Sequence, residues 1–255
     1  MRGLLFRTIA DMRRPDSWIT QLRRRRIAFF LELLSGIAHA PGRPLQLLDV
    51  GGTAFFWQML GLDSISQTSE VCETSEVYGD ATHLNAGLHL RHRPLHITLL
   101  NIAQPAAVPP NFTNLTGDGC AMPQFRDQQG DIVFSNSVIE HVGDDARQQA
   151  FAREVRRVGQ RYFVQTPNRH FPIEPHFFFP GFQFLPLATR IWLVQHFALG
   201  WFPRIPDYAA ARAEVEQIRL LTPNDMGRLF PSAHIQTERT LGLTVGVVAY
   251  EGWRN

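Results

Sequence analysis

A short apolar run that ends in a glycine turn is the sequence feature that most constrains the fold. Residues 45–50 (LQLLDV) predict a buried strand, residues 51–53 (GGT) a tight turn, and residues 54–60 a helix. A strand that leads through a turn into a helix is typical of α/β folds, in which strands and helices alternate around a parallel sheet.

The same alternation continues along the chain. Further strands are predicted at 95–102, 112–116, 131–134 and 161–166, and helices at 144–158, 208–218 and 224–230. The last two strands, 234–240 and 244–251, leave no room for a crossover helix, so the last strand should be antiparallel. We therefore expect an α/β fold with a doubly wound, mostly parallel, seven-stranded, Rossmann-like sheet.

The chain divides by composition into a main domain and three added segments. Residues 1–40 predict a basic helical extension, and residues 41–255 the main domain. Within that domain, residues 63–94 have no clear period and predict an insertion loop, while residues 170–206 are rich in Phe and Pro and predict a cap. The four arginines at 23–26 predict a solvated helix face; contact with phosphates or an anionic membrane is the alternative.

Composition excludes several classes of chemistry. The 255 residues are 44% hydrophobic with a net charge of +2, which indicates a folded globular chain and gives no broad basic footprint for nucleic acid. Two cysteines, Cys72 and Cys120, exclude a disulfide scaffold and a multi-cysteine zinc site. All 25 basic residues are arginine, so neither a Schiff-base lysine nor a phosphate-loop lysine is available.

The longest apolar stretch, residues 177–202, is broken by prolines and by Arg190, so we expect no membrane span. Without a secretory signal, we expect a cytoplasmic protein, and the sequence does not predict an oligomeric state.

Small and polar residues follow the predicted strands, where an open α/β sheet binds its ligands. They are Asp49, Gly51, Gly52 and Thr53 at or just after the end of the first strand, Asn101 at the end of the second, Asp118 and Gly119 after the third, and Ser135 and Asn136 after the fourth. Such residues suit an adenosine-type ligand, with amides for a carboxylate and an acid for an amino group. Turns in any α/β sheet favour the same residue types, which is the alternative explanation for each position alone.

Five segments in this order resemble one family. LLDVGGTAFFW, ITLLNI, GDGCAMPQF, DIVFSNSVIEHV and RYFVQTPNRHFPIEPH are similar to the class I S-adenosylmethionine-dependent methyltransferases of the type-11 methyltransferase domain group, from about residue 45 to residue 250. The resemblance implies S-adenosyl-L-methionine as the cofactor and a small-molecule, sugar or lipid-linked acceptor, methylated at oxygen or, as second choice, carbon.

The resemblance also implies roles for the strand-end residues. Asp49 and Gly51 match the signature that holds the methionine end of the cofactor, and Asn101 occupies the ribose position. Asp118 matches the acid that meets the adenine amino group, with Gly119 beside the ring. Ser135 and Asn136, listed above, would then line the floor near the sulfonium.

Three departures from the family pattern matter. Thr53 and Phe55 replace two glycines of the turn. Asn101 is neutral where the family usually has an acid, and Glu70 or Glu73 would replace it if the strand lay elsewhere. Some relatives bind a metal through two acids and a histidine around the fourth strand; Ser137 stands at the first acid's place here, so we predict no metal.

Three residues are candidates for catalysis. His141 follows the fourth strand and could act as the base for a hydroxyl nucleophile, since a histidine pKa lies near neutrality. His176 and Glu174 follow the fifth strand and could bind or deprotonate the acceptor. The structural alternatives are a histidine at a helix start and a Glu–His pair that fixes a proline-rich turn.

Two rival functions stay open at this point. A nucleotide-dependent oxidoreductase is disfavoured because the turn reads GGTAFF and lacks the G-x-G-x-x-G pattern. A non-catalytic module could instead bind a partner, or a membrane peripherally, through the basic helix and the aromatic stretch 177–206. For that stretch, a cap over the substrate pocket or a packed core segment is the favoured interpretation.

Overall fold

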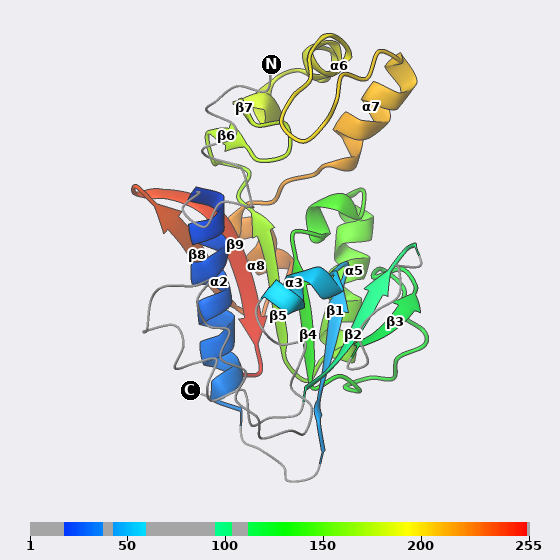
Figure 1. Cartoon of the computed structure of the whole chain (residues 1–255), viewed down its shortest axis with the longest axis vertical. Coiled ribbons are helices and arrows are strands. Elements are labelled where there is room, and N and C mark those ends of the chain that lie inside the picture. Colours follow the sequence, from blue (N-terminus) through cyan, green and yellow to red (C-terminus); the bar gives the residue numbers. More distant parts are fainter. Residues whose placement is uncertain (1–17, 38–42, 60–94, 104–111, 254–255) are drawn as a thin grey trace.

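A computed structural model of the chain describes residues 18–37, 43–59, 95–103 and 112–253 (Figure 1). The predicted insertion loop 63–94 lies outside the described residues, as do Glu70, Glu73 and Cys72.

The central sheet has seven strands in the order β3-β2-β1-β4-β5-β9-β8. The strands are β1 (Leu45–Val50), β2 (Leu95–Asn101), β3 (Phe112–Thr116), β4 (Ile132–Asn136), β5 (Tyr162–Pro167), β8 (His234–Thr240) and β9 (Leu243–Glu251). β1 pairs in parallel with both β2 and β4, and β9 runs antiparallel to β5 and β8. The predicted fold class is therefore confirmed, and the pairing of Asp49 with Leu99 confirms the placement of the second strand.

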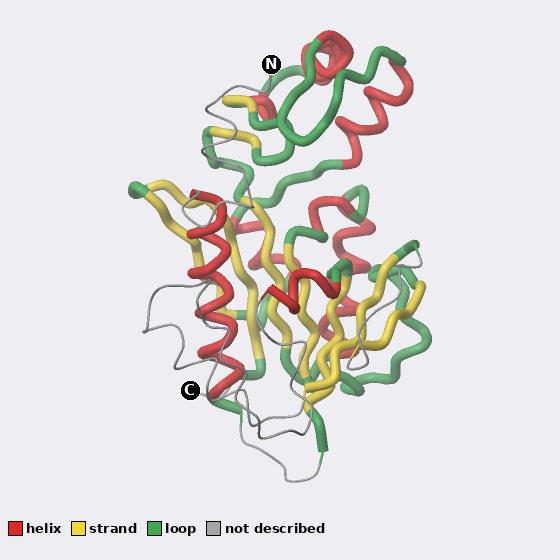
Figure 2. The backbone as a smooth tube through the Cα atoms, viewed as in Figure 1, coloured by secondary structure: helices red, strands yellow, loops and turns green. Residues whose placement is uncertain are grey.

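Helices cover both faces of the sheet, as the tube view shows (Figure 2). α2 (Trp18–Ser35) and α3 (Ala54–Met59) lie on one face, and α5 (Asp145–Val158) and α8 (Pro223–Leu229) on the other. The two-residue period of the strands builds both cores at once. In β4, Phe134 packs with α2 and α3, whereas Val133 packs with α5 and α8.

The first described helix, α2, is part of the core. Phe30 has no exposed surface and packs edge-on against Phe134 and Phe163, with ring centroids 4.8 and 5.2 Å away. Arg25 is exposed, but the Arg26 guanidinium bonds Glu238 and Asn136 at the end of the sheet. The prediction of a solvated face is thus wrong for Arg26, because its charge is paired inside the fold.

The helices on the other face begin at side-chain caps. Asp144 accepts a hydrogen bond from the backbone N–H of Arg147 at the start of α5. Thr222 and Asp225 form a reciprocal capping box at the start of α8. Each cap satisfies N–H groups that have no partner within the helix, which fixes where it begins.

The segment after β5 has its own core; we call it the cap, and it extends beyond the predicted 170–206 through the end of α7. It comprises β6 (Ile173–Glu174), β7 (Phe179–Pro180), the 3-10 turn η2 (Phe182–Phe184), α6 (Leu187–His196) and α7 (Tyr208–Gln217). Phe177, Phe182, Ile191, Val194, Ala211 and Val215 are buried together there. The chain enters and leaves the cap side by side, since Asn168 and Leu221 form a parallel bridge.

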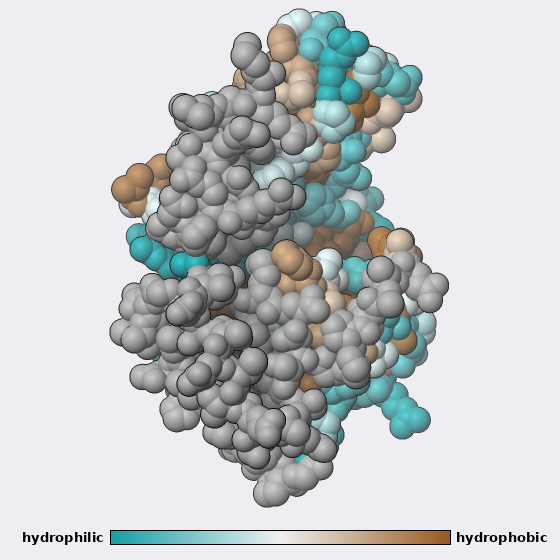
Figure 3. Space-filling view, in the orientation of Figure 1, coloured by the Kyte–Doolittle hydropathy of each residue, from teal (hydrophilic) through white to brown (hydrophobic). Residues whose placement is uncertain are grey.

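The cap keeps part of its aromatic surface exposed. Trp192, Phe197 and Trp201 are each between two-fifths and one-half exposed, and hydrophobic and hydrophilic residues lie side by side on the cap in Figure 3. Among the described residues, no helix is both long and apolar enough to cross a bilayer.

Replacing Phe30 by Ala should lower the free energy of unfolding by about 3–5 kcal/mol, because it removes the ring that joins α2 to the sheet. Urea unfolding followed by circular dichroism measures this loss. Arg25→Ala on the exposed side of the same helix is the control and should change stability by less than about 0.5 kcal/mol. A Phe30→Ala loss as small as the control's would contradict the assignment of α2 to the core.

Candidate functional site

A pocket of about 630 Å³ lies at the carboxyl ends of β1, β2 and β3. Seven of the residues predicted from the sequence line it: Gly51, Gly52, Thr53, Asn101, Asp118, Gly119 and His141. A pocket of this volume suits a ligand of nucleoside size. The structure thus gathers residues from separate strand ends around one hollow.

The turn after β1 is held by close packing. Gly51 has φ +81°, and a Cβ there would lie 2.5 Å from a methyl of Val138. A Cβ at Gly52 would lie 1.6 Å from Oδ2 of Asp49. Only glycine avoids both conflicts, and the N–H groups of Gly52 and Thr53 make no hydrogen bond to the described chain.

The Asp49 side chain packs against this turn at Gly52. Its carboxylate is buried and accepts a hydrogen bond of 2.7 Å from Trp57 Nε1. Burial raises the pKa of Asp49 to about 7, although the bond from Trp57 opposes the shift. Asp49 is not among the residues that line the pocket, so any direct role toward a ligand stays a prediction.

Asn101 and Asp118 line the pocket from β2 and from the turn after β3. Asn101 Nδ2 donates to the carbonyl of Gly52 at 3.0 Å, which ties the first two strand ends together. Asp118 accepts from the backbone of Cys120 and from the Arg147 guanidinium, both at 2.9 Å. Burial opposes the charge of Asp118, but these contacts outweigh it and hold its pKa below the usual value.

Arg147 is a pocket residue that the sequence reasoning missed. It reaches Asp118 from the first turn of α5. The available signal was the capping residue Asp144, which starts α5 three residues before Arg147. The pocket's remaining walls are largely apolar and include Leu99, Leu100, Ile102, Val138, Val142 and Phe151.

Ser135 and Asn136 are not among the residues that line this pocket. Ser135 is buried and donates to the carbonyl of Val50, so it joins β4 to β1. Asn136 accepts from Arg26 of α2. Their place near the sulfonium stays a prediction. The hydrogen bonds that they make connect β4 to β1 and to α2.

The candidate catalytic residues lie together where the cap meets the sheet. The His141 and His176 rings meet edge to face, with centroids 4.7 Å apart. Glu174 is buried and takes three hydrogen bonds, from His176 Nδ1 at 2.7 Å and from the backbone N–H groups of His176 and Phe177. Glu174 therefore fixes the ring of His176, whereas His141 alone opens into the pocket.

The two histidines favour opposite protonation states. Burial and the nearby charge of His176 lower the pKa of His141 to about 4. Burial also disfavours the charge of His176, but Glu174, with help from Glu140, outweighs it and raises the pKa. At neutral pH His141 is thus a neutral base beside a His176 whose charge is stabilised.

The same cluster contains a set of possible metal ligands. One atom each of Glu140, His141 and His176 lie within 4.8 Å of one another. Glu140 is fully buried; Oε2 accepts from Thr166, and Oε1 has no hydrogen-bond partner in the described chain. The sequence argument against a metal used only residues around the fourth strand and did not include His176. The absence of a metal therefore stays a prediction.

Replacing Glu174 by Gln should lower the pKa of His176, because the substitution removes the carboxylate charge while the ring stays buried. NMR titration of the His176 ring measures the shift. Glu214→Gln removes a carboxylate of the cap that has a weaker effect on His176, so the pKa of His176 should decrease less. Equal shifts in the two variants would show that Glu174 does not control His176.

Comparison with known proteins gives one family match and several similar folds. Residues 87–161 match the family model described as a methyltransferase domain. The CMeT domain of the citrinin polyketide synthase superposes with a TM-score of 0.53 at 12% identity, over 92% of this chain and 53% of that one. A possible exported protein from Bordetella parapertussis gives 0.49 at 12% identity, over 92% and 69% of the two chains.

The DszA carbon methyltransferase gives a TM-score of 0.48 at 12% identity, over 93% of this chain and 56% of that one. No curated protein matches the sequence. The chain spans about half the length of the citrinin synthase structure that it resembles. The sequence match, the strand order and the similarity to the CMeT domain together identify the fold of this chain as that of the class I S-adenosylmethionine-dependent methyltransferases.

Proposed function

We propose that the chain is an S-adenosylmethionine-dependent methyltransferase that acts on a small-molecule, sugar or lipid-linked acceptor, at oxygen in preference to carbon. The family match and the fold support this class of enzyme and this cofactor. The observation that carries the proposal is the single pocket at the strand ends, which Gly52, Asn101 and Asp118 line from three different turns.

The pocket has the donor and acceptor groups that this cofactor needs. The free N–H groups of Gly52 and Thr53 suit its carboxylate, and the Asn101 amide suits a ribose hydroxyl. The Asp118 carboxylate suits the adenine amino group, and the apolar lining, which includes Leu100 and Phe151, suits the ring. When bound, the cofactor supplies a methyl group on a positively charged sulfur.

His141 is the residue best suited to assist an oxygen nucleophile. It lines the cofactor pocket, and its lowered pKa leaves a ring nitrogen free to accept the acceptor's hydroxyl proton. His176 and Glu174 then act by position, since Glu174 holds the neighbouring ring against His141. The exposed cap aromatics Trp192, Phe197 and Trp201 suit an apolar acceptor or peripheral contact with a membrane.

The non-catalytic rival loses part of its support. Arg26, from the basic helix that such a module would use, is paired with Glu238 and is only 10% exposed. Titration of the chain with S-adenosylhomocysteine and, separately, with NAD distinguishes the candidates. Binding of the first alone supports a methyltransferase, binding of NAD supports an oxidoreductase, and binding of neither supports a module without either activity.

Replacing Asp118 by Asn should weaken S-adenosylhomocysteine binding at least tenfold. A hydrogen bond to a charged group contributes about 1.5–3 kcal/mol, and the substitution also removes the ion pair with Arg147. Calorimetric titration measures the dissociation constant. Asp127→Asn, at a carboxylate that pairs with Arg157 outside the pocket, is the control and should leave affinity unchanged. Equal affinity in the two variants would place the adenine elsewhere.

Replacing His141 by Gln should lower kcat roughly 10²- to 10⁴-fold, the usual contribution of a general base, and leave S-adenosylhomocysteine affinity nearly unchanged. The measurement is transfer of a labelled methyl group to whichever acceptor a screen of hydroxylated compounds identifies. His170→Gln, at an exposed histidine outside the pocket, should retain full activity. Full activity of His141→Gln would exclude it as the base.

A further inference from the structure

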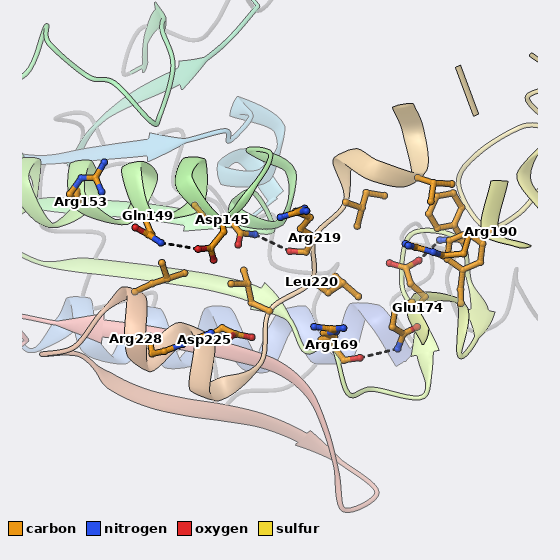
Figure 4. Close-up of a pocket in the computed structure, with 18 of the residues that line it drawn as sticks. Asp145, Gln149, Arg153, Arg169, Glu174, Arg190, Arg219, Leu220, Asp225 and Arg228 are labelled. Carbon is orange, nitrogen blue, oxygen red and sulfur yellow. Dashed lines mark hydrogen bonds and ion pairs between the residues drawn. The ribbon is translucent and has the colours of Figure 1, made fainter. Parts of the chain in front are cut away.

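A second cleft, of about 700 Å³, lies between the cap and the outer face of α5 and α8 (Figure 4). It is separate from the cofactor pocket, and the two share no lining residue. Six arginines line it, from α5, from the loop after β5, from α6, from the segment before α8 and from α8 itself: Arg153, Arg156, Arg169, Arg190, Arg219 and Arg228. Nearly a quarter of the 25 basic residues of the chain therefore line one cleft.

The carboxylates of the cleft are fewer and already have partners. Asp145 accepts a hydrogen bond from Gln149, and Asp225 binds Thr222 and Arg228. Glu174 is engaged by His176 and by two backbone N–H groups. The protein therefore does not neutralise the excess positive charge of the cleft with its own acids.

Four of the guanidinium groups make no side-chain hydrogen bond or ion pair within the described part of the chain. They are Arg153, Arg169, Arg190 and Arg219. Figure 4 shows Arg169, Arg190 and Arg219 toward the cap and Arg153 at the far end of the cleft. A guanidinium group at a surface usually finds water or a carboxylate, but these groups line a concave site that an anion could fill.

Arg190 is the least satisfied of these groups. Its Nε is buried without a hydrogen-bond partner, and Oε1 of Gln183, which also lines the cleft, is likewise buried and unpaired. Burial and the positive charge of Arg169 both lower the pKa of Arg190, although Glu216 and Glu174 oppose the shift. The positive charge of Arg169 therefore acts against that of the partly buried Arg190, and an anion bound near both groups would stabilise both.

The walls of the cleft are not purely polar. Ile218, Leu220 and Leu229 line it beside the arginines. Guanidinium groups bind phosphate oxygens through paired N–H donors, whereas apolar side chains favour an organic group. The geometry points to an organic phosphate as the ligand of this cleft, with its phosphate held by Arg169, Arg190 and Arg219 and its apolar part against the leucines.

This site does not depend on the proposed methyl transfer. Among the described residues, Glu174 links the two regions through His176 and the His141 ring that opens into the cofactor pocket, and α5 lines both, with Arg147 at the pocket and Gln148 at the cleft. The phosphate could belong to a soluble compound or to a lipid headgroup, and the two sources offer the same group to the arginines.

The test is calorimetric titration of the full chain with phenyl phosphate, and flotation with vesicles that contain phosphatidic acid. We expect saturable binding of at least one probe, and at least fivefold weaker binding to Arg169→Gln and Arg190→Gln. Binding of phenyl phosphate indicates a soluble ligand, and binding to the vesicles alone indicates a headgroup; both support the site. Sodium sulfate at equal ionic strength should compete poorly with phenyl phosphate.

Arg239→Gln, at an exposed arginine of β8 outside the cleft, is the matched control and should bind as the unchanged chain does. Arg169 is exposed, so its variant should fold even if the variant of the partly buried Arg190 does not; circular dichroism verifies this. S-adenosylhomocysteine affinity should be unchanged in both cleft variants. Binding of neither probe, or equal loss in Arg239→Gln and Arg169→Gln, would overturn the proposal.

Discussion

The contact between the Asp49 carboxylate and the turn that follows β1 is the constraint on which the pocket at the strand ends depends. Because Asp49 Oδ2 occupies the space where a Cβ of residue 52 would lie, the turn must carry glycine there. Trp57 of α3 donates to the same oxygen and so fixes the helix to the strand that precedes it. Asn101 then binds the carbonyl of Gly52, which brings the end of β2 to the same place. One buried carboxylate thus organises two strand ends and a helix.

The sequence predicted the strands well because most of them, unlike β8, are short apolar runs bounded by turn residues. β2 was predicted at 95–102 although it follows a long segment without a hydrophobic pattern, because LHITLLNI is apolar enough to be buried. The predicted residues that line one pocket, such as Gly52 and Asp118, follow strands directly. Topology alone brings such positions together, because parallel strands end at one edge.

What the sequence could not predict depends on side-chain direction and on contacts distant in the chain. Ser135 and Asn136 also end a strand, yet their hydrogen bonds go to β1 and to α2. Whether a residue at a strand end faces a pocket or a neighbouring element depends on local twist, which the pattern does not encode. Arg147 reaches Asp118 because of its position in the first turn of α5. Arg26 pairs with Glu238, which lies 212 residues further along the chain.

Burial and charge set the two histidines apart. Glu174 favours the charged form of His176, whereas burial, together with the charge of His176, disfavours protonation of His141 and outweighs the opposing effect of Glu174. Two residues of the same type thereby acquire different chemistry from their surroundings. His141 lines the pocket at the strand ends, and Glu174, which binds His176, lines the arginine cleft.

The parallel bridge between Asn168 and Leu221 has a consequence for how such a chain can vary. Since both ends of the cap leave the sheet at adjacent points, lengthening, shortening or exchanging the segment between them shifts no strand register. The cap also buries Phe177, Phe182 and Ile191 among its own residues, in a cluster separate from the two cores of the sheet. Variation confined to the cap would therefore leave the strand ends that line the pocket in place.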